Sequence, residues 1–63
     1  MEAMTKKEHE FYMFLQENGG ELHITHEEIA KIFKLSTSVI TKRIDSLANK
    51  GYITKSKRYI SIT

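Results

Sequence analysis

The sequence predicts a small α+β domain of three helices and three short strands, in the order helix, strand, helix, helix, strand, strand. Three observations predict it. Two capping boxes, Thr5-Lys6-Lys7-Glu8 and Thr25-His26-Glu27-Glu28, each precede an apolar-periodic segment, which is typical of a helix start. A third such segment begins by Ser36, a few residues after the second ends at Phe33. Residues 52–54 begin a strand, and after a polar corner residues 58–62 alternate in the manner of a half-buried returning strand, as in a β-hairpin.

The length and composition limit the classes of protein to consider. A chain of 63 residues forms one domain and buries about 60% of its unfolded surface. We treat residues 1–63 as a single domain, with residues 1–4 expected to be disordered or vector-derived. No apolar run approaches the roughly 18 residues of a membrane span, so we expect a cytoplasmic protein without membrane contact. The absence of cysteine excludes disulfides and thiolate metal sites.

The first helix is expected to begin at the capping box of Thr5 and to end at residues 18–20, Asn-Gly-Gly, because glycine accepts the left-handed conformation that closes a helix. Its apolar side carries Phe11, Phe14 and Leu15. Residues 22–24, Leu-His-Ile, alternate in polarity and predict a very short strand.

The second helix is expected to run from His26 to about Phe33 and the third from Ser36 or Thr37 to Lys50, before Gly51. On a wheel of 100° per residue the apolar residues of the third helix form one stripe. The predicted buried residues of the two helices are Ile29, Ala30, Ile32, Phe33, Ile40, Ile44, Leu47 and Ala48.

The C-terminal hairpin follows Gly51. Residues 52–54 are expected to begin a strand, residues 55–57, Lys-Ser-Lys, to form the corner, and residues 58–62 to return with Ile60 and Ile62 inward.

The corner between the second and third helices is the most informative feature. A three-residue turn makes two helices cross steeply, which is the geometry of a helix-turn-helix. We expect Ser36 to cap the third helix, Leu35 to fill the space between the helices, and Ala30 to lie at their closest approach.

The residues that match a known family pattern are Glu28-Ile29-Ala30, Phe33, Leu35-Ser36, Ile40, Lys42, Leu47 and Lys50-Gly51-Tyr52-Ile53. Over about residues 22–62 the sequence resembles the winged helix-turn-helix family, most closely the DNA-binding domains of Crp-type bacterial regulators. The resemblance implies a winged-helix fold and DNA binding. One departure is Lys34, where the family usually has glycine because the turn there tends to adopt a positive φ.

Charge is divided unequally along the chain. Residues 1–35 hold four lysines against seven glutamates, a net charge of −3, whereas residues 36–63 hold six cations against Asp45 alone, a net charge of +5. This asymmetry indicates that one end of the molecule meets a polyanion.

In the family, the helix at residues 36–50 enters the major groove with its N-terminal part, and the hairpin at residues 52–62 lies on the backbone. The groove-facing candidates are Thr37, Ser38, Thr41 and Lys42, which carry no arginine or asparagine fork and predict modest sequence discrimination. The phosphate-contact candidates are Arg43, Lys55, Lys57, Arg58, and Ser36 and Thr25 at their helix starts.

Each of these assignments has an alternative. The polar face of the third helix can be merely solvated, Arg43 can form a surface ion pair, and the hairpin cations can serve solubility. Tyr59 beside Lys57 and Arg58 can stack on an unpaired base or cover the outer side of the ribbon.

The function expected from these residues is duplex DNA binding, in transcription regulation or in replication control of a bacterial mobile element, with a homodimer or a larger parent protein as partner. The alternatives are single-stranded DNA binding through the wing, and a protein-docking module. An enzyme is not expected, since no nucleophile has a partner base and no deep cleft fits this size. No cofactor or metal is expected, because His23 and His26 belong to different elements and no third ligand is fixed.

Overall fold

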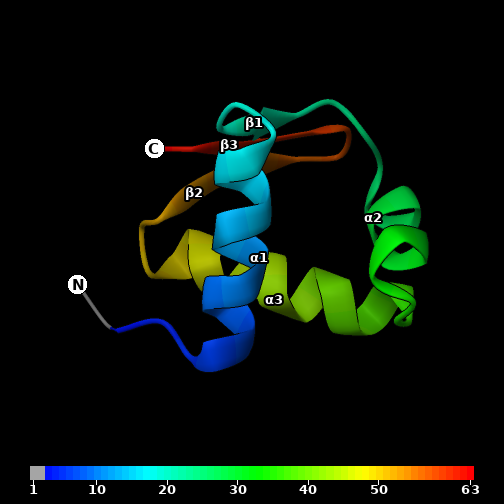
Figure 1. The fold of residues 1–63 in the computed structure, drawn as a ribbon, viewed down its shortest axis with the longest axis horizontal. Helices are drawn as coiled ribbons and strands as arrows, with labels where there is room; N and C mark the ends of the chain where they lie inside the picture. The colour runs from blue at the N-terminus through cyan, green and yellow to red at the C-terminus, as the bar shows by residue number, and fades with distance from the viewer. Residues whose placement is uncertain (1–2) are drawn as a thin grey trace.

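A computed structural model describes residues 3–63 and has the predicted order of elements (Figure 1). Its helices and strands are α1 (Lys6–Glu17), β1 (Glu21–Leu22), α2 (His26–Phe33), α3 (Thr37–Asn49), β2 (Ile53–Ser56) and β3 (Tyr59–Ile62). The α+β winged-helix class predicted from the sequence is confirmed. Helix α1 crosses in front of α3 and the sheet in this view, and α2 stands beside the N-terminal end of α3.

The expectation for residues 1–4 falls partly on Met1 and Glu2, which lie outside the described residues. Met4 is partly buried and packs against the core.

Helix α1 starts and ends where its sequence predicts. Thr5 Oγ1 accepts a hydrogen bond from the Glu8 amide at 3.2 Å, and Glu8 Oε1 accepts one from the Thr5 amide at 2.8 Å. At the other end the Gly20 amide donates to the Leu15 carbonyl at 2.8 Å. Gly20 has a φ of 85°, which is the left-handed conformation that glycine adopts without strain.

Lys34 makes the corner between α2 and α3. It has a φ of 58° and a ψ of 41°, so the positive φ expected for this turn is present at a non-glycine residue. The Leu35 amide donates to the Ala30 carbonyl at 3.0 Å and closes the end of α2. A lysine in this conformation costs about 1 kcal/mol relative to its preferred backbone geometry.

The core is a single cluster between the three helices and the inner face of the sheet. Seven side chains within it have less than 2% exposure: Phe11, Leu15, Ile29, Ile40, Ile44, Leu47 and Ile60. Phe33 closes the α1–α2 gap, with its ring 5.6 Å from that of Phe11 and 5.0 Å from that of Phe14.

Two predictions about buried residues were wrong. Ile32 is 56% exposed and Leu35 is 39% exposed. Phe33 and Ile29 already occupy the side of α2 that faces α1 and α3, and this turns Ile32 outward. Leu35 directly follows the left-handed Lys34 and stays exposed, whereas Ala30 and Ile40 are buried in the core.

The sheet has the strand order β1-β3-β2, with both pairs antiparallel. The first strand covers residues 21–22 rather than 22–24, because its ladder with β3 ends at the Leu22–Ile60 pair. The hairpin corner is residues 57–58 rather than 55–57. Ser56 pairs with Tyr59, so a two-residue turn suffices and Lys55 stays in β2.

Glu8 is the one polar residue buried in the part of the chain that the structure describes, at 5% exposure. Lys50 Nζ donates to its Oε1 at 2.6 Å, and the Ser46 hydroxyl donates to its Oε2. The hydrogen bonds from Lys50, Ser46 and the Thr5 amide lower the pKa of Glu8 to about 2, against the opposing effect of burial. The network fixes α1 across α3.

Candidate nucleic-acid interface

The first turn of α3 presents the polar groups expected at a nucleic-acid surface. Ser36 is the N-cap, and its Oγ accepts a hydrogen bond from the Val39 amide at 3.3 Å and lies 3.4 Å from Ser38 Oγ. Ser36, Thr37 and Ser38 are all exposed. Hydroxyls and amides without intrahelical acceptors therefore lie together at this helix end, where they are able to contact phosphates and base edges.

Two basic residues continue this surface along α3. Lys42 is exposed one turn beyond Ser38, whereas Arg43 is half-buried on the flank of the helix. Within residues 3–63 neither side chain forms an ion pair. The ion-pair alternative for Arg43 is therefore absent from the described part of the chain.

Thr41 differs from the other groove-facing candidates. It is half-buried, and its Oγ1 lies 3.4 Å from Nδ1 of His26 at the start of α2. The hydroxyl is thus engaged within the protein, and no property of the sequence alone reveals this contact across 15 positions.

The wing is the hairpin of β2 and β3, with Lys57 and Arg58 at its tip. Ser56 Oγ donates to the Tyr59 carbonyl at 3.2 Å and closes the turn. Both tip cations are exposed and, among the residues that the structure describes, neither forms an ion pair. The tip is therefore a compact positive surface.

Lys55 has a different environment from the tip cations. Its Nζ donates to Asp45 on α3, and both side chains are 43% exposed. This pair links β2 to α3 and neutralises one of the three hairpin cations.

Tyr59 is held against β1. Its hydroxyl donates to Glu21 Oε2 at 3.0 Å, and its ring centroid lies 4.7 Å from that of His23. His23 Nε2 is in turn 3.5 Å from Glu21 Oε1. In this arrangement the ring covers the outer side of the ribbon next to the turn at the wing tip.

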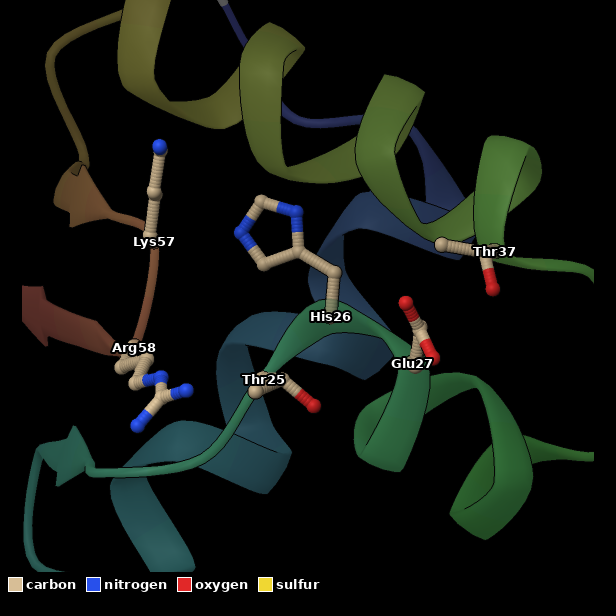
Figure 2. A pocket seen from close by; sticks show the side chains of 6 residues that line it. All are labelled: Thr25, His26, Glu27, Thr37, Lys57 and Arg58. Atoms are coloured by element: carbon tan, nitrogen blue, oxygen red, sulfur yellow. The ribbon is translucent and has the colours of Figure 1, made fainter.

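A hollow of about 370 Å³ joins the wing to the helix-turn-helix. Figure 2 shows Lys57 and Arg58 on the wing side, Thr37 at the start of α3, and His26 between them. Thr25 and Glu27 complete the lining. The fold therefore brings the wing tip and the start of α3 to the same region, although they lie 20 positions apart in the sequence.

The two histidines considered as metal ligands have different partners. His23 contacts Glu21 and Tyr59, whereas His26 contacts Thr41. From Ala3 to Thr63, no three His, Cys, Asp or Glu side chains are arranged to hold a metal ion. Over the same residues, no helix is both long enough and apolar enough to cross a membrane.

Comparison with known families adds to this geometry. A family model described as winged helix-turn-helix DNA-binding matches residues 14–54, from the C-terminal half of α1 to the first residues of β2. The comparisons with curated proteins and with solved structures returned no match.

Proposed function

Because the chain belongs to the winged helix-turn-helix DNA-binding family, we propose that it regulates transcription by inserting α3 into the major groove of duplex DNA and resting the wing on the flanking backbone. The residues in this proposal are those at the start of α3 and at the wing tip. These interface residues are Ser36, Thr37, Ser38, Lys42, Lys57 and Arg58, with Arg43 at the flank of α3.

The observation that carries the proposal is the proximity of the wing tip to the start of α3. Lys57 and Arg58 share a hollow with Thr37, so hydroxyl groups and cations face one region of solvent. An α-helix fits the major groove of B-DNA, and cations beside it meet the adjoining phosphates. One duplex can therefore contact both elements at once.

A single module of this size buries limited surface on DNA, about 600–1,000 Å². The proposal therefore includes a second copy of this chain or a larger partner to supply further contacts.

Two features bear on the rival functions. The engagement of Tyr59 by Glu21 and His23 disfavours base stacking on its ring and supports duplex over single-strand binding. A second feature favours the protein-docking alternative. Apolar surface is exposed at the corner of the helix-turn-helix, as a docking module requires, by Ile32, Leu35 and Val39.

A fluorescence-polarisation titration with a random duplex and with its separated strands distinguishes these functions. The phosphate-contact candidates Arg43, Lys57 and Arg58 form no ion pair among residues 3–63, so about three counterions are released on binding. We expect the duplex to bind more tightly than either strand, and its affinity to fall about 40-fold between roughly 50 and 200 mM salt. Tighter binding of the strands would favour the single-strand mode, and no binding of either form at low salt would favour docking.

A further inference from the structure

His26, the first residue of α2, stands between the two elements of the proposed interface, the start of α3 and the wing tip. Its ring projects from the first turn of α2 toward α3, with Lys57 on one side and Thr37 on the other (Figure 2). Nδ1 lies 3.4 Å from Thr41 Oγ1, and Nε2 is buried without a hydrogen-bond partner among the described residues. A buried polar atom without a partner costs stability, so packing alone does not explain a histidine here.

The contact with His26 restricts the side-chain conformation of Thr41. Threonine in a helix divides between two χ1 rotamers, because its hydroxyl is able to bond a carbonyl of the preceding turn. A hydrogen bond to His26 selects the rotamer that directs the hydroxyl toward α2. The γ-methyl group is then fixed in a different direction.

We propose that His26 is a specificity-determining positioning residue, which holds the Thr41 hydroxyl against α2 so that α3 offers the Thr41 methyl group to the bases. This inference rests on the proposed function, in which α3 lies in the major groove. The matching chemical group there is the C5-methyl of thymine, which contacts apolar side-chain groups. His26 thereby acts on base preference through Thr41, without contacting a base.

The test compares thymine with uracil, which differ only in that methyl group. Duplexes selected from a random library by the wild-type protein are resynthesised with each thymine replaced in turn by deoxyuridine. We expect at least one replacement to weaken wild-type binding about fourfold, the value for burial of one methyl-sized group. The quantity compared is the ratio of the affinity for the thymine duplex to the affinity for the matching uracil duplex. We expect His26→Ala to lower this ratio to about one, while the affinity for the uracil duplex and the salt dependence stay unchanged.

Two variants at position 41 separate positioning from a general structural effect. Thr41→Ser keeps the hydroxyl for His26 but lacks the methyl, so the thymine-to-uracil ratio should fall to about one. Valine in a helix adopts one χ1 rotamer about 90% of the time, so Thr41→Val should restore the ratio in the His26→Ala background. A merely structural role of His26 predicts no such rescue.

The outcomes distinguish this inference from the proposed function. A thymine-to-uracil affinity ratio equal to that of the wild type, in His26→Ala or in Thr41→Ser, would overturn the inference alone. So would a wild-type protein whose affinity does not change with any thymine replacement. Failure of the wild type to bind any duplex would overturn the proposed function as well. The Thr41→Ser measurement leaves His26 in place, so the inference remains testable if His26→Ala does not fold.

Discussion

Glu8 and Lys50 lie 42 positions apart in the sequence, yet Lys50 Nζ donates a hydrogen bond of 2.6 Å to Glu8 Oε1. The pair joins the first turn of α1 to the C-cap of α3, and both side chains are largely buried, at 7% and 14% exposure. Lys50 Nζ also donates to the Ala3 carbonyl at 3.2 Å. The position of the helix that we propose to read DNA is thus fixed in part by an ion pair at its C-terminal end.

Glu8→Gln should lower the free energy of unfolding by about 3 kcal/mol, because it leaves the Lys50 ammonium without its carboxylate. Urea denaturation followed by circular dichroism measures this. The control is Glu10→Gln on the exposed side of the same helix, which should change stability by less than about 0.5 kcal/mol. Equal effects of the two substitutions would contradict the role given to Glu8.

The stability contributed by Glu8 should depend on pH in the acid range. Its folded-state pKa is lowered from 4.5 to about 2, so the unfolded state binds more protons between these values and stability falls as pH decreases. The contribution is fully present above pH 4.5 and is lost as pH falls toward 2. We expect the difference in unfolding free energy between wild type and Glu8→Gln to shrink over that interval. A difference that stays constant from pH 7 to pH 2 would contradict the lowered pKa.

Lys34→Gly should stabilise the domain by about 0.5–1 kcal/mol, because glycine occupies the left-handed conformation at this corner without steric cost. Thermal unfolding measures the change. Lys31→Gly is the matched control: it removes the same charge inside α2, where glycine should destabilise by about 1 kcal/mol. Destabilisation by both variants would show that the corner is not strained.

Lys42→Ala and Lys57→Ala should each weaken duplex binding, and Lys57→Ala should also reduce the slope of log affinity against log salt by about 1, since it removes one phosphate contact. Lys7→Ala is the control, because it removes the same charge from the first turn of α1, at the far end of the molecule from the wing tip (Figure 1). Unchanged duplex affinity in both interface variants, with unchanged melting temperatures, would remove these two residues from the proposed interface.

Tyr59→Ala should leave duplex affinity within about twofold of the wild type, because the proposed duplex contacts come from the wing cations and α3. In the single-strand mode, loss of a stacking ring instead costs about 1–3 kcal/mol per base. Tyr59→Phe keeps the ring and loses only the hydrogen bond to Glu21, so it separates stacking from anchoring of the wing. Parallel titrations of a duplex and a single strand measure both.

Local signals in the sequence were sufficient to predict the order of the elements and the bounds of the helices to within about a residue. The capping boxes at Thr5 and Thr25 define the starts of α1 and α2 through contacts only three residues long, and Gly20 marks a stop that depends on its own backbone. The family pattern associates this turn with a positive φ, and the structure shows that Lys34 adopts one although it is not glycine. Such contacts are encoded within a few neighbouring residues, which is why the sequence reveals them.

The features that the sequence could not reveal depend on distant partners. Ile32 and Phe33 are equivalent in hydrophobicity, and only the rings of α1 decide which of them is buried. The contacts of Glu8 with Ser46 and Lys50, and of His26 with Thr41, each join separate elements. A helical wheel places Thr41 beside the polar face of α3, but it contains no information about the neighbouring helix that engages its hydroxyl.

Because β3 lies between its two partners, only β1 and β2 leave backbone groups open along the margins of the sheet. The edge strand β1 is only two residues long. The edge strand β2 carries Lys55, a charged side chain of the kind that discourages strand addition. A foreign strand therefore finds little template on which to extend this sheet, and fibrous self-association by that route is disfavoured. We therefore expect a second copy to attach through side chains elsewhere on the molecule.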